Sequence, residues 1–185
     1  KALYILHSRK IMHRDVKSMN VLYDGSLNCG LLNLGLLNCN DFSTGSSTGF
    51  SNGFSTGSSN GFSNMHFVLT DFGEAVKMKT PQTHTIKGTI SWSAPEIFQR
   101  CYSYGADVWA FGMLLYEMMT LQIPYHKEKF VASAIIDAKT PEIGQNIMAK
   151  YADIIPLYEN CITYDENKRA DMETVRRMIE TLKTL

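Results

Sequence analysis

The amino-acid sequence predicts a mainly α-helical domain with one small β-hairpin, whose loop is long and of low complexity. Three observations support this fold class. Beyond residue 96 the apolar residues recur at helical spacing or fill helix-length segments. Earlier in the chain, two short runs of β-forming residues, 21–23 and 66–70, have the composition of paired strands. Between those runs lies a stretch rich in Gly, Ser, Asn and Thr, which buries too little apolar surface to fold by itself.

The overall composition is that of one globular domain without a charge preference. The chain has 185 residues, of which 44% are apolar, and it contains 18 basic and 18 acidic residues. This balance gives no electrostatic reason to expect nucleic acid or an anionic membrane as a partner. The composition leaves the oligomeric state open.

The cysteines and the apolar runs indicate a cytoplasmic protein. The four cysteines include no CxxC pair, so we expect neither a zinc site nor a disulfide framework, and a reducing compartment suits them. The longest apolar run, Val108 to Tyr116, is too short to span a bilayer. We therefore expect this chain to be cytoplasmic, and the sequence leaves open whether it belongs to a longer protein that is anchored in a membrane. Because the chain begins with Lys1 inside a helical pattern, we also expect a fragment.

The low-complexity stretch divides the predicted domain in two. Residues 25–64 contain a single charged residue, Asp41, and repeat the pattern FSTGSSTGFSNG as FSTGSSNGFSN. Hairpin loops usually contain about 2–5 residues, so a loop of this length is exceptional. We expect it to be disordered, and the alternative is a docking motif based on its phenylalanines. The domain therefore comprises residues 1–24 and 65–185, with 25–64 as an insertion.

Four helices are predicted downstream of the hairpin. Residues 107–120 are apolar on nearly all sides, which indicates a buried central helix. Residues 127–139 and 151–162 each carry an apolar stripe, and Pro156 either begins or kinks the second of these helices. Asp171 is placed to cap a final helix, whose inward face would hold Met172, Val175, Ile179 and Leu182.

Three motifs carry the predicted chemistry. Residues 13–20 read HRDVKSMN, residues 71–73 read DFG and residues 94–96 read APE. Any one tripeptide arises readily by chance, but all three in this order, with Lys and Asn correctly placed after Asp15, form a specific signal. These residue types suit phosphate transfer, which needs a positioned nucleophile and neutralisation of the phosphate charge.

In these motifs the chain resembles a eukaryotic protein kinase catalytic domain, specifically its C-terminal lobe, and within that family the tyrosine-kinase-like serine/threonine kinases. The likeness covers residues 1–24 and 65–185 and includes GTISWS at 88–93 and DVWAFG at 107–112. The resemblance implies the mainly α fold of a kinase C-lobe. It also implies transfer of the ATP γ-phosphate to a Ser or Thr hydroxyl of a protein substrate, with ATP and Mg²⁺ as cofactors.

The resemblance implies a role for each residue of the central motifs. Asp15 would orient the substrate hydroxyl and accept its proton, and Lys17 would steady the transferred phosphate. Asn20 and Asp71 would hold magnesium through oxygen donors. Lys17, Asn20 and Asp71 would thereby contact the nucleotide, and Leu22 would lie under its adenine.

The resemblance also implies a substrate site and a switch beside these motifs. Thr89 would line the substrate site next to the catalytic aspartate. Arg14 would bind a phosphate group on the segment between the DFG and APE motifs, where Thr80, Thr83 and Thr85 are candidate acceptors.

Structural contacts are implied as well. His13 and Phe72 would stack in the hydrophobic spine of the domain, Glu96 would pair with Arg169, and Asp107 would anchor the loop of residues 13–20 from beneath. The remaining histidines show no ligand spacing and are expected to be ordinary residues: His7, His66, His84 and His126.

Parts of the family pattern are missing from the sequence. We find no glycine-rich loop followed by valine, no strand lysine and no helix that supplies its glutamate partner. Since ATP binds between two lobes in this family, we expect the chain alone to be inactive. A non-catalytic lobe that acts as a binding module is the alternative, and a small-molecule kinase is a weaker one. The intact Asp15, Asn20 and Asp71 favour the catalytic interpretation.

Overall fold

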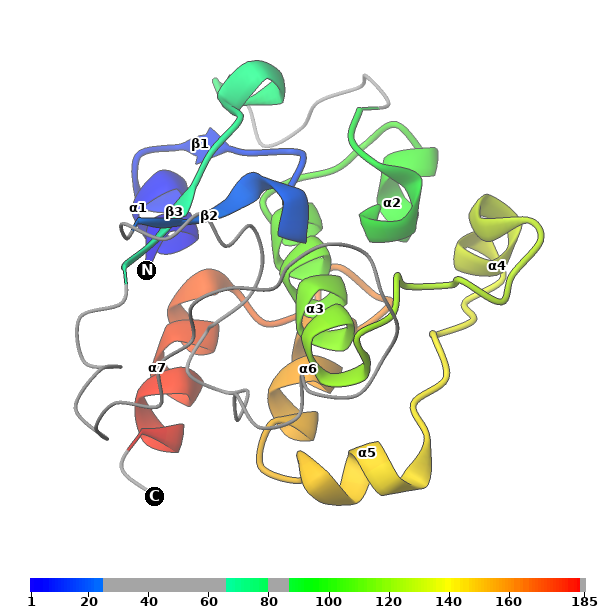
Figure 1. The fold of residues 1–185 in the computed structure, drawn as a ribbon. Coiled ribbons are helices and arrows are strands. Elements are labelled where there is room, and N and C mark those ends of the chain that lie inside the picture. Colours follow the sequence, from blue (N-terminus) through cyan, green and yellow to red (C-terminus); the bar gives the residue numbers. More distant parts are fainter. Residues whose placement is uncertain (25–65, 80–86, 184–185) are drawn as a thin grey trace, which may run out of the picture.

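In the part of the chain that the structure describes, the fold is mainly helical, with two small antiparallel sheets at one end of a central helix (Figure 1). The computed structural model describes residues 1–24, 66–79 and 87–183. The first part of the described chain comprises α1 (Ala2–Ser8), β1 (Ile11–Met12), η1 (Ser18–Asn20), β2 (Val21–Asp24), β3 (His66–Leu69), η3 (Phe72–Glu74) and β4 (Val76–Lys77). The predicted insertion, residues 25–64, lies outside the described residues.

The regular elements of the second part of the described chain are all helices. It comprises η4 (Ile90–Trp92), α2 (Pro95–Phe98), α3 (Gly105–Thr120), α4 (Val131–Ile136), α5 (Gln145–Lys150), α6 (Ile155–Cys161) and α7 (Met172–Leu182). This order confirms a mainly α fold with a small β-hairpin. None of the helices among the described residues is long and apolar enough to cross a membrane.

The central helix is α3, which runs through the middle of the molecule and packs against α6 and η4 (Figure 1). Its side chains Trp109, Met113 and Leu115 are fully buried, as expected for a helix that is apolar on nearly all sides. Gly112 allows the close approach of α6, because a Cβ atom there would lie 2.8 Å from Cβ of Cys161. Packing on all sides therefore gives α3 a fixed position from which it can support other elements.

Both small sheets join segments that are far apart in the sequence. In the predicted hairpin, β2 pairs with β3 with Val21 opposite Leu69 and Leu22 opposite Val68. A second sheet, which was not predicted, pairs β1 with β4 and places Met12 opposite Val76. Its strands contain two residues each, and so short a run carries no recognisable alternation.

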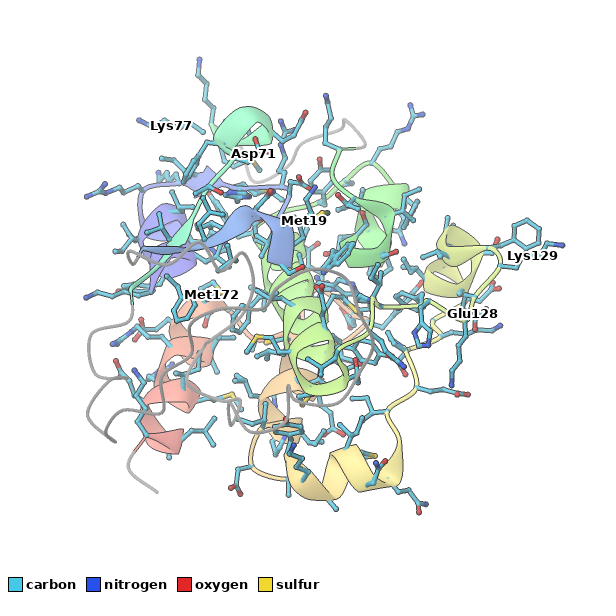
Figure 2. The ribbon with its side chains drawn as sticks, viewed as in Figure 1. Met19, Asp71, Lys77, Glu128, Lys129 and Met172 are labelled. Atoms are coloured by element: carbon cyan, nitrogen blue, oxygen red, sulfur yellow. The ribbon has the colours of Figure 1, made fainter. Side chains whose placement is uncertain are left out.

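Two of the predicted helices, at 127–139 and 151–162, are observed with narrower limits, as α4 and α6. The apolar stripe of residues 127–139 predicts a long helix, but α4 covers only Val131–Ile136, and Phe130 is 68% exposed. The helix ends because Ala138 adopts a left-handed conformation and Lys139 N–H donates to the carbonyl of Ala134. Figure 2 shows the neighbouring Lys129 at the outer edge of the molecule, beyond α4.

Two open questions at helix ends are settled by the structure. Pro156 lies in the first turn of α6, so it begins this helix and does not kink it. Asp171 is the N-cap of α7, and its carboxylate accepts a hydrogen bond of 2.8 Å from the backbone N–H of Thr174. The expected inward face of α7 is confirmed, with Met172 and Val175 buried.

Candidate active site

The pairing of the strands brings the two central motifs face to face. The loop of residues 13–20 connects β1 to β2, and the segment 70–75 connects β3 to β4. Because β1 pairs with β4 and β2 with β3, these two connections must lie opposite each other. The contact is closed by Thr70, whose N–H and hydroxyl both donate to the carbonyl of Asn20, at 2.8 and 3.1 Å.

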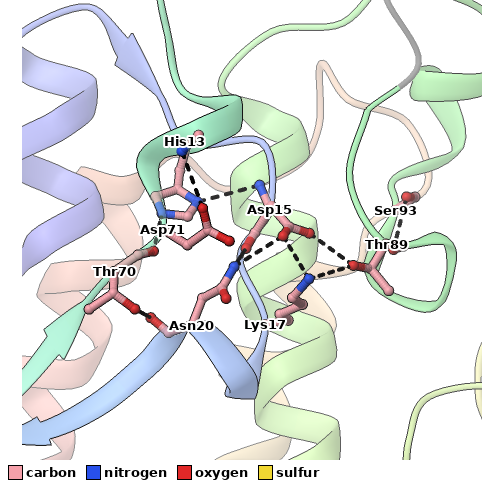
Figure 3. A network of polar contacts seen from close by, with 9 residues as sticks. His13, Asp15, Lys17, Asn20, Thr70, Asp71, Thr89 and Ser93 are labelled. Carbon is pink, nitrogen blue, oxygen red and sulfur yellow. Dashed lines mark hydrogen bonds and ion pairs between the residues drawn. The ribbon is translucent and has the colours of Figure 1, made fainter.

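Asp15 is the centre of a network of short polar contacts (Figure 3). The Lys17 ammonium donates to Oδ2 of Asp15 at 2.7 Å and to the hydroxyl of Thr89 at 2.8 Å. The Thr89 hydroxyl in turn donates to Oδ1 of Asp15 at 2.9 Å. The Asn20 side-chain amide donates to the backbone carbonyl and to Oδ2 of Asp15, at 2.8 and 3.1 Å. The structure thus brings these four sequence-predicted residues together.

The network keeps Asp15 ionised. Burial acts to raise the pKa of this carboxyl, but the hydrogen bonds from Lys17, Thr89 and Asn20 outweigh burial and hold the pKa below its usual value. An ionised carboxylate within hydrogen-bonding reach of a bound hydroxyl can orient that hydroxyl and accept its proton.

Asp71 and Asn20 supply oxygen donors next to this network. Figure 3 shows both side chains on the side of Asp15 away from Thr89. Asp71 has a left-handed backbone conformation (φ 58°), and its Oδ1 accepts a hydrogen bond of 3.3 Å from Gly73 N–H. The amide nitrogen of Asn20 is engaged with Asp15, so its oxygen is the atom that would take a metal ion.

This donor set fits Mg²⁺ in the presence of a nucleotide. Across the described parts of the chain, no three His, Cys, Asp or Glu side chains are grouped to hold a metal ion. Mg²⁺ is typically bound through one or two carboxylates together with substrate phosphates, and a carboxylate plus an amide oxygen meets that requirement.

A buried carboxylate on the central helix supports the loop of residues 13–20. Asp107 accepts hydrogen bonds of 2.8 Å from the backbone N–H groups of His13 and Arg14. It also lies 2.9 Å from Nε2 of His7 on α1. The first two contacts confirm the expected anchoring role of Asp107. The contact with His7 was missed, because nothing in the local sequence distinguishes this histidine from a surface residue.

A second contact between the central helix and this loop was also missed. The Ser18 hydroxyl donates to Oε1 of Glu117 at 2.6 Å in a buried position. Burial raises the pKa of Glu117, while the bond from Ser18 acts in the opposite direction. The available signal was the position of Glu117 in a helix that is apolar on nearly all sides, because a buried carboxylate needs a hydrogen-bonding partner.

Arg14, which is expected to bind a phosphate group, lies next to the oppositely charged Glu74. The Nε of Arg14 donates to the carbonyl of Glu74, and its guanidinium lies 3.9 Å from the Glu74 carboxylate. Lys87 donates to the same carboxylate at 3.2 Å. The candidate phosphorylation sites Thr80, Thr83 and Thr85 lie outside the described residues.

The other expected contacts are present. The rings of His13 and Phe72 meet edge to face, with 5.1 Å between their centroids. The Arg169 guanidinium binds Glu96 with two hydrogen bonds, of which one measures 3.0 Å. Leu22, expected under the adenine, lies on β2 with 47% of its surface exposed.

Comparisons with known proteins point to one family. A family model of the protein kinase domain matches residues 1–178. The chain is 29% identical to the serine/threonine-protein kinase shk2 of Schizosaccharomyces pombe over 92% of its residues and 23% of that protein. It is 34% identical to the serine/threonine-protein kinase fused of Drosophila melanogaster, over 73% of this chain and 12% of that protein.

A third relative also matches over only part of its own length. Human mitogen-activated protein kinase kinase kinase 11 is 30% identical over 62% of this chain and 14% of that protein. The chain thus spans only a small part of each of these three relatives.

Proposed function

The chain belongs to the protein kinase domain family, and from this premise we propose that it is the C-terminal lobe of a serine/threonine protein kinase. The activity is transfer of the γ-phosphate of ATP to a Ser or Thr hydroxyl of a protein substrate. The observation that carries the proposal is the network around Asp15, in which Lys17 and Thr89 contact the carboxylate and each other. The printed names of the relatives, which are serine/threonine kinases, support the same activity.

The proposed roles follow from the chemistry of phosphate transfer. Asp15 orients the substrate hydroxyl with its ionised carboxylate and accepts the hydroxyl proton, as the new oxygen–phosphorus bond forms and the bond from the γ-phosphorus to the leaving ADP breaks. Lys17, which already neutralises Asp15, is close enough to stabilise charge on the transferred phosphoryl oxygens. Asn20 and Asp71 would hold Mg²⁺, which neutralises phosphate charge when bound.

The position of Lys17 favours serine and threonine as acceptors. Its ammonium bridges the proposed base, Asp15, and Thr89, which we expect to line the substrate site. These three side chains are therefore in direct contact. The hydroxyl of Ser or Thr lies close to the backbone of the substrate, so the substrate backbone must approach these three side chains closely. The phenol oxygen of Tyr lies much further from the substrate backbone. The compact arrangement therefore supports a Ser/Thr substrate.

The proposed partners are ATP and a protein substrate. Leu22 offers an exposed apolar surface on β2, which suits contact with an adenine ring. The described cysteines Cys101 and Cys161 are free thiols, which supports a reducing, cytoplasmic location.

The test uses the kinase of which we propose this chain to be the C-terminal lobe, called the full-length protein below, with ATP carrying a labelled γ-phosphate and casein as a generic acceptor. We expect Asp15→Ala and Asp71→Ala each to lower turnover about 100-fold or more while the protein stays folded, because both roles belong to the transition state. Asp153→Ala, which removes an exposed aspartate far from these motifs in sequence, is the matched control and should retain normal turnover.

The same assay contains the outcomes that would contradict the proposal. Near-normal turnover of Asp71→Ala would refute the magnesium assignment. Phosphotyrosine as the main product in phosphoamino-acid analysis would refute the serine/threonine assignment. A folded wild-type protein that transfers no phosphate would favour the non-catalytic binding module.

A further inference from the structure

The guanidinium of Arg14 is a positive charge held next to the proposed base. Arg14 directly precedes Asp15 in the chain, and its side chain is only 12% exposed. A guanidinium stays charged at every physiological pH, so one with so little contact to water needs acceptors from the protein or from a ligand. Within the described ranges, the acceptors near this guanidinium both belong to Glu74: its carbonyl and, at 3.9 Å, its carboxylate.

The Glu74 carboxylate joins this arginine to a second cation from a distant part of the chain. Its Oε2 lies 3.9 Å from the guanidinium of Arg14, and its Oε1 accepts a hydrogen bond of 3.2 Å from the ammonium of Lys87. Glu74 and Lys87 are both partly open to solvent, so water screens these contacts and they add little to the stability of the fold. Their effect is to fix where Lys87 lies relative to Arg14.

The position of Lys87 matters because the two residues after it lie against the loop of residues 13–20. Gly88 has a φ of 100°, and a Cβ atom there would lie 2.6 Å from the carbonyl oxygen of Arg14. The segment therefore passes directly over the backbone of Arg14. Thr89 follows, and its hydroxyl donates to Asp15 at 2.9 Å. Glu74 thus holds the beginning of a segment whose next residues complete the network around Asp15.

A phosphate group on the segment 80–86 would compete with this carboxylate. It would bring nearly two negative charges to Arg14 and Lys87, the same two cations that Glu74 already contacts. It would also lie beside Glu74 itself, where like charges repel. Since Glu74 supplies a negative charge at this place without any modification, a phosphate there would gain little.

We propose that Glu74 is a positioning residue that supplies the negative charge for Arg14 and Lys87 from within the chain, so that phosphate transfer does not require phosphorylation of the segment 80–86. This inference rests on the proposed kinase function. It makes the phosphorylation switch suggested by the sequence unnecessary for turnover. Because Glu74 acts through Arg14 and Lys87 on the geometry of the site, its loss should lower kcat more than it weakens binding of ATP or acceptor.

The first test removes the candidate phosphate acceptors from the full-length protein. We expect the triple variant Thr80→Ala, Thr83→Ala and Thr85→Ala to keep its kcat on casein within about three-fold of the wild type, because the charge that Arg14 needs is still present. Mass spectrometry verifies that residues 71–96 of the variant carry no phosphate. A larger loss of kcat in this folded, unphosphorylated variant would overturn the inference.

The second test removes the charge of Glu74 in the same triple variant. We expect Glu74→Gln to lower kcat about ten-fold, with KM for ATP and casein within about two-fold, because Arg14 and Lys87 lose their shared counter-ion. Glu128→Gln is the matched control, since this similarly exposed carboxylate also lies 3.9 Å from a cation, Lys139. Figure 2 shows Glu128 beside α4, away from Asp71, so this variant should keep its kcat.

An exchange of charges distinguishes ion pairing from packing. Glu74→Lys places a third cation beside Arg14 and Lys87 and should lower kcat more than ten-fold. Adding Lys87→Glu to that variant returns a carboxylate to the same place and should bring kcat back to within about three-fold of the triple variant. A double variant no more active than Glu74→Lys alone would overturn the inference. Melting temperatures correct each rate for the folded fraction.

A readout that does not depend on activity separates this inference from the proposed function. Amide hydrogen exchange across residues 87–90 should be faster in Glu74→Gln than in Glu128→Gln, because Lys87 loses its acceptor. Unchanged exchange or unchanged kcat in Glu74→Gln would overturn the inference. If the wild type transfers no phosphate, the proposed function fails, and the exchange rates alone decide whether Glu74 holds this segment.

Discussion

At the scale of single residues, the properties of Asp15 are set by contacts that arrive from different parts of the chain. Lys17 lies two positions further on in the same loop, while Thr89 precedes η4. Together with the Asn20 amide they overcome the effect of burial and keep the pKa of Asp15 low. A base that stays ionised at neutral pH is available for every turnover without prior loss of a proton.

Replacing Lys17 by methionine should therefore have two linked effects. The pKa of Asp15 should rise, since the ammonium no longer stabilises the carboxylate, and turnover in the full-length protein should fall about 100-fold, since charge on the phosphoryl group loses its partner. Turnover at neutral pH and the titration of Asp15 by NMR measure the two effects. Lys168→Met, at an exposed lysine near Asp165, is the control and should change neither.

The sign of the pH dependence follows from the lowered pKa. The interaction of Asp15 with its donors stabilises the folded state fully above the usual carboxyl pKa of 3.8, and this contribution is lost as pH falls through the lower folded-state pKa. In Lys17→Met the lowering is smaller, so the loss should occur at a less acidic pH. If the acid unfolding curves of the wild type and of Lys17→Met coincided, this account would be contradicted.

At the scale of elements, short helices in this fold depend on their ends and on tertiary packing. The α7 helix begins at a side-chain cap, where Asp171 accepts from Thr174 N–H, and it packs against α1 and α6. The α4 helix, in contrast, has no side-chain cap and ends after six residues at a left-handed alanine. Helix limits are thus set by capping and backbone conformation as much as by the apolar stripe.

The cap of α7 gives a prediction for stability. Asp171→Ala should lower the free energy of unfolding by about 1 kcal/mol, the usual contribution of an N-cap side chain. The hydrogen bond from Thr174 N–H lowers the pKa of Asp171, so this contribution should be complete above the usual pKa of 3.8 and disappear as pH falls through the folded value. Urea unfolding at neutral and acid pH measures it.

The controls for this experiment are simple. Asp171→Asn keeps a capping oxygen and should retain most of the stability, whereas Asp153→Ala removes an exposed aspartate and should have little effect. An alanine variant as stable as the wild type at neutral pH would show that α7 does not depend on this cap.

At the scale of the whole molecule, one buried ion pair joins two distant regions. Arg169, which precedes α7, binds Glu96 of α2 with both arms of its guanidinium. It also donates to the carbonyl of Gly105, at the start of α3, and its guanidinium lies 5.0 Å from the Trp109 ring. The pair therefore holds the end of the APE motif against the central helix.

Removing one member of this pair should destabilise the whole fold. Arg169→Met should lower the free energy of unfolding by about 3–5 kcal/mol, because the Glu96 carboxylate stays buried without its counter-ion. Arg177→Met, at an exposed position of α7, should change it by less than about 0.5 kcal/mol. Denaturant unfolding measures both, and similar values for the two variants would show that the buried pair is not needed for stability.

The sequence by itself determined the features that rest on local patterns. The motif residues Asp15, Lys17 and Asp71 could be identified because their order and spacing are specific. The central helix, the β2–β3 hairpin and the Asp171 cap were predicted correctly because a long apolar run, β-forming composition and capping act over a few neighbouring residues.

Only the tertiary structure revealed two of the contacts between distant side chains. His7 and Asp107 are 100 positions apart, and Ser18 and Glu117 are 99 apart, so no local pattern could pair them. The short sheet of β1 and β4 and the early end of α4 likewise depend on how the chain packs. A hydrogen bond in a buried site forms where packing excludes water and leaves a donor and an acceptor to satisfy each other, and that arrangement is a property of the whole fold.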